Sequence, residues 1–117
     1  MHNFRQLKIW IEAMAIAKEV YLITSRFPVS ERYSLSSQMN RCSISVPSNI
    51  AEGSARNSNK ESQHFLSIAL GSLFELETQA ILSQEVGYLE FTSYENLVLR
   101  IVQLQKMIVT FKKTLSD

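Results

Sequence analysis

The sequence predicts an all-α protein, an up-down-up-down antiparallel four-helix bundle that forms a single domain over residues 1–117. Two observations predict this fold. Four segments repeat apolar side chains at steps of three and four residues, with short connections between them. The chain also contains only three Gly and two Pro, too few for the many turns of an all-β protein. At this length it can bury about two-thirds of its unfolded surface in one core.

The first helix is expected from Asn3 to Arg26. Asn3 suits the N-cap position, where its side chain can accept a backbone N–H. Pro28 disfavours the α conformation at Phe27, so the helix is expected to end there. Between these limits, one face carries mostly apolar side chains: Leu7, Trp10, Met14, Ala17, Tyr21 and Thr24.

The second helix is expected from an N-cap at Ser30 to Glu52, with Gly53 as the residue that ends it. Pro47 lies inside this segment. It removes one backbone hydrogen bond and crowds the carbonyl of Ser43. We therefore expect one helix that is kinked near Pro47, and the alternative is two helices that meet there.

The third helix is expected to begin after Ser58, which can form a capping box with Glu61, and to stop at Gly87. The fourth is expected to open at Thr92 or Ser93 and to carry the most regular apolar stripe of the chain.

Two further features of these helices predict contacts with other helices. Gly71 lies in the middle of the third helix, where glycine costs about 1 kcal/mol relative to alanine, so we expect another helix to approach it closely. The fourth helix has a second apolar stripe, which predicts an interface between subunits. That stripe consists of Val98, Val102, Met107 and Val109.

A polar stripe on the second helix is the most unusual pattern in the chain. At about 100° per residue its five members fall within about 80° of one another. In an antiparallel helix pair, Glu75 of the third helix comes within reach of Arg41. We expect a partly buried network that fixes the register of the two helices, and the alternative is a direct role in ligand binding. The expected network comprises Gln38, Arg41, Ser45, Asn49, Glu52 and Glu75.

The sequence carries no pattern that predicts catalysis. Glu61 and His64 form one Glu-x-x-His motif, whereas a dinuclear metal site in a bundle needs two such motifs and two further glutamates. The other histidine is His2, near the chain end. Cys42 has no histidine placed to activate it and is expected to be a small buried residue. We therefore expect no enzyme, no catalytic residue, no cofactor and no metal site.

Composition also bears on the compartment. Polar residues interrupt every uncharged stretch, and no basic segment followed by an apolar core opens the chain, so we expect neither a membrane span nor a secretory signal. A single cysteine cannot form an internal disulfide. These features predict a cytoplasmic protein that does not contact the membrane.

A net charge of +1 does not by itself indicate a nucleic-acid-binding protein. The cations nevertheless gather in the first and last segments, and an oligomer would multiply them. Each taken singly is also compatible with an ordinary solvated helix face. The candidate nucleic-acid-binding residues are Arg5, Lys8, Arg26, Lys106, Lys112 and Lys113.

The run from Gln38 to Gly53 resembles the signature of the four-helix-bundle proteins encoded in intervening sequences of bacterial 23S ribosomal RNA genes, loosely called S23 ribosomal proteins. Asn40 departs from this pattern, because the family commonly has a second basic residue there. Matching positions cover nearly the whole chain. They include Trp10, Tyr21, Phe27, Pro28, Tyr33, Arg41, Ser45, Val46, Pro47, Asn49, Glu52, Arg56, Glu61, Leu66, Gly71, Leu73, Glu75 and Tyr88.

The resemblance implies a bundle that assembles into a ring, most simply a homopentamer. The chain is also similar to the accessory protein of diversity-generating retroelements, which works with a reverse transcriptase and its RNA. These likenesses imply a non-enzymatic, RNA-associated accessory protein. Its expected partners are RNA or DNA, and a protein that processes nucleic acid. The alternative is a protein–protein scaffold of the same ring architecture with no physiological nucleic-acid ligand. Basic residues that cluster on one exposed face favour the first, and basic residues paired with carboxylates favour the second.

Overall fold

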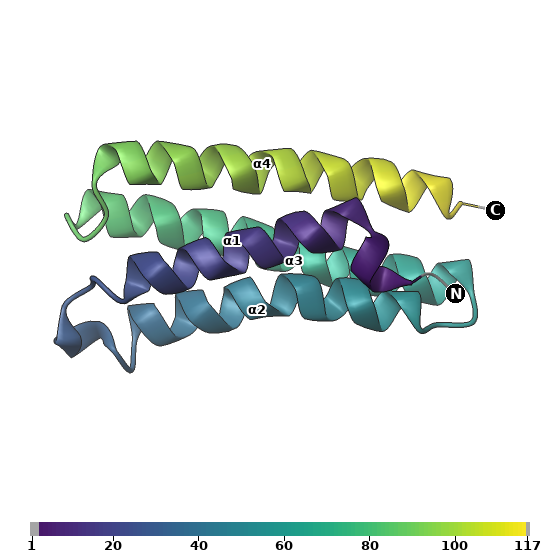
Figure 1. The fold of residues 1–117 in the computed structure, drawn as a ribbon, viewed down its shortest axis with the longest axis horizontal. Coiled ribbons are helices and arrows are strands. Elements are labelled where there is room, and N and C mark those ends of the chain that lie inside the picture. The colour runs from purple at the N-terminus through teal and green to yellow at the C-terminus, as the bar shows by residue number, and fades with distance from the viewer. Residues whose placement is uncertain (1–2, 117) are drawn as a thin grey trace.

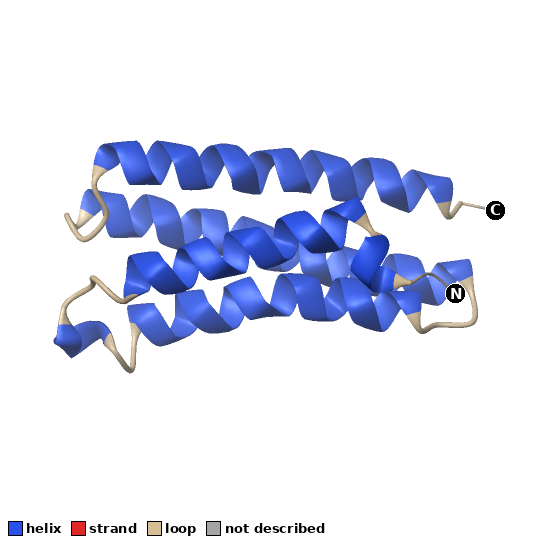
Figure 2. Ribbon diagram, in the orientation of Figure 1, coloured by secondary structure: helices blue, strands red, loops and turns tan. Residues whose placement is uncertain are grey.

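The computed structural model of the chain describes residues 3–116, and within this range it contains helices and connections but no strand (Figure 2). The long helices are α1 (Lys8–Thr24), α2 (Leu35–Ser54), α3 (Asn59–Glu85) and α4 (Phe91–Thr114), and two 3-10 turns, η1 (Phe4–Gln6) and η2 (Val29–Glu31), precede α1 and α2. The long helices run alternately in opposite directions, so both ends of the chain lie at one end of the bundle (Figure 1). The predicted up-down-up-down bundle is confirmed.

One apolar face of every long helix points into a common core. The bundle measures 46 × 24 × 20 Å, so this core is an elongated column rather than a sphere. Burying a side chain the size of leucine stabilises the folded state by about 1.5–3 kcal/mol. The column contains Ile16 and Val20 of α1, Met39, Val46 and Ile50 of α2, Leu73 and Leu76 of α3, and Leu97, Ile101, Leu104 and Ile108 of α4.

The N-terminal segment differs from the predicted continuous helix. Asn3 does act as a cap, because its Oδ1 accepts the backbone N–H of Arg5 at 3.3 Å, but it caps η1 rather than α1. Leu7 then adopts an extended conformation and α1 begins at Lys8. The Phe4 ring packs edge-on against Trp10 at 5.4 Å, which holds the turn against the bundle. His2 lies outside the described residues.

The predicted start of the second helix at Ser30 is wrong. Residues Val29–Glu31 form η2, and α2 begins only at Leu35. The Glu31 carboxylate accepts hydrogen bonds from the Ser34 hydroxyl at 2.8 Å and from the Tyr88 hydroxyl at 3.3 Å. These contacts tie the connection to the α3–α4 turn, which a straight helix from Ser30 would not do.

Pro47 lies inside a single unbroken α2. Side chains around it bind backbone carbonyls: the Ser43 hydroxyl donates to Asn40 O at 2.9 Å, and Asn49 Nδ2 donates to Ser45 O at 2.8 Å. The predicted continuation of the helix through the proline is confirmed, and the kink stays a prediction.

Two of the three glycines play roles other than those predicted. Gly53 lies within α2 rather than ending it, because its φ is not positive. No other atom lies within 4 Å of the Cβ position of Gly71, so the expected close approach of a neighbouring helix is wrong within the protomer. Gly87 alone has a positive φ, of 86°, among the residues described, and it follows the end of α3 as predicted.

α3 is apolar on two faces. Its inward face contributes Leu66, Leu73 and Leu76 to the core. The opposite side carries a row of exposed side chains that we call the outer face of α3: Ile68, Phe74, Ile81, Leu82 and Val86. By length and composition this helix could cross a membrane, with a mean hydropathy of 1.3 over 18 residues, yet 33% of that window is buried inside the bundle. A core helix with a second apolar face meets the same criterion.

The second apolar stripe of α4 is mostly used within the protomer. Val98 and Met107 pack against the core and Val102 is half-buried, whereas Val109 is 40% exposed. Most of the stripe predicted as a subunit interface therefore packs within the protomer. More exposed apolar side chains lie on the outer face of α3 than on this stripe.

Candidate nucleic-acid interface

The six predicted nucleic-acid-binding residues divide between the two ends of the bundle. Lys8 begins α1 and Arg26 lies beyond its other end, so a helix of 17 residues, about 25 Å long, separates them. α4 ends beside the start of α1 (Figure 1). The structure therefore brings five of the six to the end that carries the chain termini. We call them the terminal cations: Arg5, Lys8, Lys106, Lys112 and Lys113.

Two terminal cations flank a groove between α1 and α4. Its floor is apolar and includes Leu7, Met107 and Phe111, and Lys8 and Lys106 line its sides. The groove has a volume of about 600 Å³. A cationic rim around an apolar floor can bind phosphates along the rim, or an apolar segment of a protein partner on the floor.

The other two lysines of α4 line a polar pocket of about 430 Å³ shared with α3. Lys112 Nζ donates to the Ser67 hydroxyl at 2.8 Å, and Gln63 Nε2 donates to Lys112 O at 3.1 Å. His64 and Lys113 also line this pocket. Gln63, His64 and Ser67 of α3 were not predicted as partners of these lysines. In an antiparallel bundle the start of α3 lies beside the end of α4, and this pairing could have indicated the contact.

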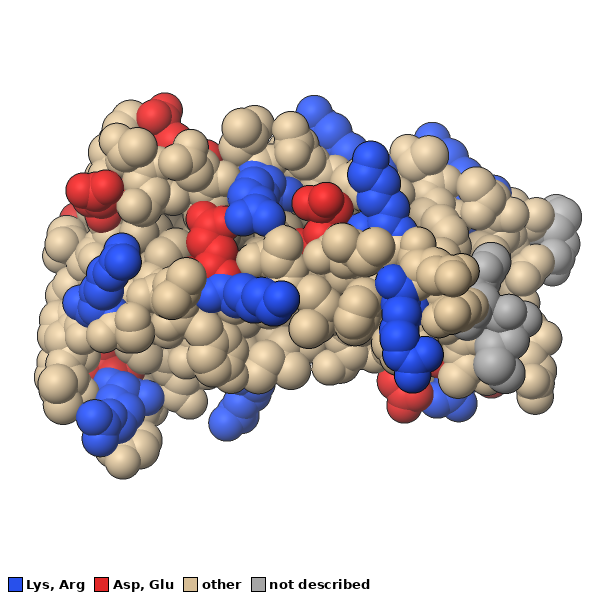
Figure 3. Space-filling model, in the orientation of Figure 1, with Lys and Arg blue, Asp and Glu red and all other residues tan. Residues whose placement is uncertain are grey.

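Among residues 3–116, the terminal cations have no carboxylate partners. Between residues 3 and 116 the ion pairs are Arg56–Glu52 and Arg100–Glu19, so none of the six candidates takes part in one. Lys8 lies at the N-terminus of α1, where the helix dipole disfavours a cation, and no acidic residue stands in that first turn. Helix stability therefore does not account for Lys8. Figure 3 shows Lys and Arg side chains over both halves of this face, spaced apart rather than fused into one patch.

Two uncharged members of the predicted polar stripe, Ser45 and Asn49, form a network between α2 and α3. The Ser45 and Ser72 hydroxyls lie 2.9 Å apart, and Asn49 Nδ2 donates to Ser45 O at 2.8 Å and to Ser45 Oγ at 3.0 Å. The Cys42 thiol donates to Ser72 O at 2.9 Å. These groups bind one another, so they fix the packing of the two helices and leave few donors for a ligand.

The charged members do not join this network. Arg41 and Glu75 are both exposed, and neither takes part in an ion pair within the described chain. Gln38 is also exposed, and Glu75 accepts only a long hydrogen bond from Gln79, at 3.5 Å. The expected contact between Arg41 and Glu75 is therefore wrong. Arg41 lies at one edge of the stripe, where it faces solvent, whereas Ser45 lies further inside and contacts Ser72 of α3.

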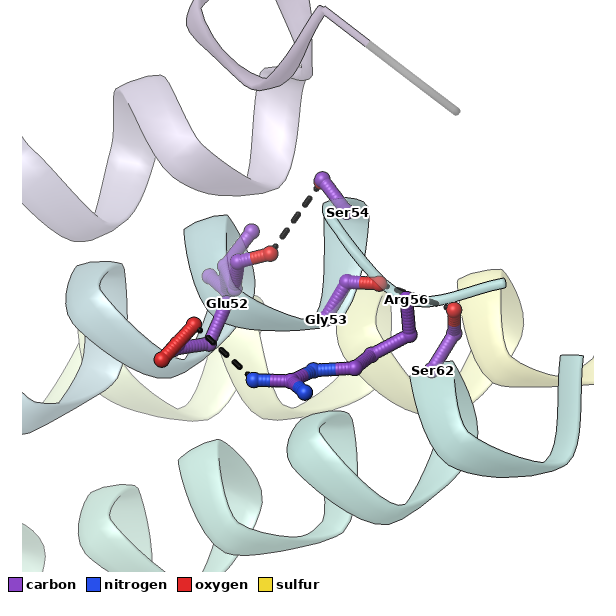
Figure 4. A network of polar contacts seen from close by, with 6 residues as sticks. Glu52, Gly53, Ser54, Arg56 and Ser62 are labelled. Atoms are coloured by element: carbon purple, nitrogen blue, oxygen red, sulfur yellow. Dashed lines mark hydrogen bonds and ion pairs between the residues drawn. The ribbon is translucent and has the colours of Figure 1, made fainter. Parts of the chain in front are cut away.

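The last part of the signature builds the α2–α3 turn, as the close view in Figure 4 shows. Glu52 pairs with Arg56 at 3.2 Å, and the Arg56 guanidinium lies 4.6 Å from the centre of the Phe65 ring. Gly53 O accepts the Ser62 hydroxyl at 2.8 Å. A Cβ at Gly53 would lie 3.2 Å from Phe65 Cβ, so glycine permits this close approach.

The two residues that raised the question of catalysis or metal binding have plain surroundings. Cys42 is buried, and burial together with the nearby Glu75 carboxylate raises its pKa to about 12. A thiol with that pKa is neutral and a poor nucleophile at physiological pH. His64 is exposed beside the Phe65 ring, and no group of three potential metal ligands converges among residues 3–116.

The model of the family described as 23S rRNA-intervening sequence protein matches residues 5–110. Among solved structures, the chain is similar to a protein of unknown function from the S23 ribosomal protein family of Bacteroides thetaiotaomicron VPI-5482. The TM-score is 0.83 at 22% identity, and the match covers 90% of this chain and 98% of that chain, which shows the fold. A search among curated proteins found none that matches.

The family match agrees with the resemblance drawn from residues 38–53. It extends well beyond that run, from the first 3-10 turn into the last turns of α4. The chain belongs to the 23S rRNA-intervening sequence protein family.

Proposed function

We propose that this protein is a non-enzymatic accessory protein that binds nucleic acid, with structured RNA as the first candidate, and that it acts as a homo-oligomeric ring. The single observation that carries the proposal is the set of terminal cations, none of which is paired with a carboxylate in the described chain. Membership of a family named for an rRNA intervening sequence supports an association with RNA.

The expected mode of binding is electrostatic. Lysine and arginine side chains neutralise phosphates and release counterions, and this gives affinity that falls steeply with salt and depends little on sequence. Five cations per protomer are a modest set, but a ring repeats them around its axis. Assembly is therefore part of the proposal.

The outer face of α3 is the surface we assign to contacts between copies in that ring. Phe74, Leu82 and Val86 are each about half exposed, with relative accessibilities of 54, 48 and 51%. Apolar surface of this kind on a soluble protein marks an interaction site. Gly71 lies in the same row with open space above it, so a neighbouring helix can approach the backbone there.

The test is anisotropy binding of a fluorescent hairpin RNA and a length-matched DNA duplex across a salt series, with light scattering on the same samples. The variant Lys106→Gln/Lys112→Gln/Lys113→Gln removes three terminal cations. The charge-matched control Lys18→Gln/Arg26→Gln/Arg41→Gln removes three exposed cations that lie away from the terminal end. We expect the first variant to lower the salt slope by about 2–3, as for two to three lost phosphate contacts, and the control to change it little.

Two outcomes would overturn parts of the proposal. Equal losses in the test variant and its control would show that net charge, rather than the terminal end, governs binding. No binding at low salt by a protein that light scattering shows to be assembled would reject the nucleic-acid function.

A protein–protein scaffold is the second candidate, and the α1–α4 groove favours it. The apolar floor formed by Leu7, Met107 and Phe111 suits an amphipathic helix of a partner, such as a nucleic-acid-processing protein. Met107→Glu would block such a partner while leaving the terminal cations in place. Retained RNA binding by this variant would separate the two functions.

A further inference from the structure

A second recess lies at the opposite end of the bundle from the terminal cations. It is formed where α1 ends, the connection crosses over and α2 begins, and it has a volume of about 310 Å³. This is at the lower end of the range for small-molecule sites, about 300–1,000 Å³. Tyr21 and Phe27 supply aromatic walls, and Arg32, Ser36 and Asn40 supply polar ones. We call it the connection pocket.

Asn40 presents hydrogen-bond donors to this pocket. Its Oδ1 lies 2.8 Å from the hydroxyl of the buried Thr24 and accepts from it, and the same hydroxyl lies 3.3 Å from Tyr21 O. Its Nδ2 has no acceptor within residues 3–116. The contact with Thr24 therefore uses the oxygen of the amide and leaves its two N–H donors for a ligand.

Ser36 is the second observation. The residue is only 8% exposed, and its hydroxyl has no hydrogen-bond partner in the described part of the chain. This hydroxyl is not among the fully buried, unpartnered polar atoms of the described chain, so it reaches the solvent in the pocket and can donate to a ligand that binds there.

The mouth of the pocket adds charge and an aromatic surface. Arg32 is exposed and forms no ion pair among residues 3–116, so its guanidinium is available to an anion. Tyr21 is 47% exposed. The site thus combines a stacking surface, amide and hydroxyl donors, and a cation. This set matches a planar group rich in acceptors that carries a negative charge.

We propose that the connection pocket binds one unpaired nucleotide, with the base against Tyr21 and within reach of Asn40 and Ser36, and the phosphate at Arg32. The shared chemistry is a nucleoside 5′-monophosphate, which can be free or part of an RNA loop. As a loop-binding site the inference rests on the proposed nucleic-acid function, and it adds a preference for unpaired over paired nucleotides. Nucleotides in duplex present no free base to such a pocket.

The experiment uses the full chain and two sets of probes. The four nucleoside 5′-monophosphates are titrated separately while backbone amide shifts are followed by NMR. A hairpin RNA and a blunt duplex RNA of equal length are compared by anisotropy. We expect saturable shifts at Tyr21, Ser36 and Asn40, and tighter binding of the hairpin than of the duplex.

Three variants sharpen the test. Ser36→Ala removes a hydroxyl that bonds to nothing among residues 3–116, and should weaken nucleotide binding about fivefold, as expected for one hydrogen bond. Asn40→Asp keeps the oxygen that Thr24 binds but replaces the donors by a negative charge, and should weaken binding about tenfold or more. Ser37→Ala, on the neighbouring residue outside the pocket, is the matched control and should bind like the wild type.

The outcomes of this pocket and of the proposed function are separable. Salt-dependent RNA binding without nucleotide shifts, equal for hairpin and duplex and unaffected by Asn40→Asp, would reject the pocket and leave the terminal cations as the RNA site. Nucleotide binding that Asn40→Asp abolishes, in a protein that binds neither RNA, would support the pocket for free nucleotides and reject the nucleic-acid function. Loss of binding in Ser37→Ala equal to that in Ser36→Ala would also reject the pocket.

Discussion

The seam between α2 and α3 and the end that carries the chain termini are both rich in polar side chains, but those side chains differ in what they bind. At the seam, Ser45, Asn49 and Ser72 bind one another or the backbone. At the terminal end, Lys8 and Lys106 line a groove and pair with no carboxylate of the described chain. Polar groups that satisfy one another fix the fold, whereas those left unpaired are available to a partner. Substitutions at the seam should therefore change stability, and substitutions at the terminal end should change binding.

The largest effect on stability is expected at Gly53. Its Cβ position lies 3.2 Å from Phe65 Cβ and 3.3 Å from Ser62 O, so Gly53→Val forces α3 away from α2. We expect a loss of about 1–3 kcal/mol in the free energy of unfolding, measured by urea denaturation. Ala55→Val, at an exposed position at the end of α2, is the control. Equal losses in both variants would contradict the close approach at Gly53.

Cys42 should make the seam sensitive to alkaline pH. The pKa of its thiol rises from 9.0 to about 12 on folding, because of burial first and the Glu75 carboxylate second. Above pH 9 the unfolded chain releases this proton while the folded chain retains it, so stability should fall as pH rises from 9 towards 12. Thermal melts across this range should show a shallower decline for Cys42→Ala. Identical pH profiles for the two proteins would rule out the thiol as the cause.

A smaller loss is expected from Ser72→Ala, which removes the hydroxyl 2.9 Å from Ser45 Oγ. The cost should be about 1 kcal/mol, because Ser45 keeps Asn49 as a partner. Ser48→Ala, an exposed position on α2, is the control and should leave the denaturation midpoint within error. A neutral Ser72→Ala would mean that apolar packing alone fixes the seam.

The smallest effect on stability is expected at the terminal end. Lys112→Gln/Lys113→Gln removes two cations from the last turn of α4, and a favourable helix-dipole interaction with them, for a loss of about 0.5 kcal/mol or less. The same variant should weaken RNA binding and flatten its salt dependence. A large loss of stability with unchanged RNA binding would reverse the assignment of the two regions.

The sequence predicted the four helices, their antiparallel order and the end of α3 at Gly87, because these follow from periodicity and from local turn chemistry. It did not predict that Glu31 would bind Ser34 and Tyr88 and delay α2 until Leu35, since that contact joins residues far apart in the chain. Helical spacing likewise placed Arg41 and Ser45 on one stripe. It could not show which edge of a stripe about 80° wide would face solvent.

The candidate site was predictable only as a set of residues. Spacing does not reveal that Arg26 lies a helix length away from Lys8, or that Lys112 binds Ser67. The connection pocket gave no signal in the sequence, because its members come from two helices and the connection between them. Apolar periodicity also could not separate the inward and outward faces of α3, both of which are hydrophobic.

The buried Cys42 thiol has a practical consequence for following this molecule in solution. Cys42 is the one cysteine of the chain, and a neutral, buried thiol reacts slowly with maleimides at pH 7. A cysteine introduced at an exposed position therefore becomes the single reactive handle without removal of the native one. One preparation would carry a dye on a cysteine introduced at Ser30, and a second would carry another dye on a cysteine introduced at Asn96. Energy transfer in a mixture of the two would report distances between copies, while Cys42 stays unlabelled.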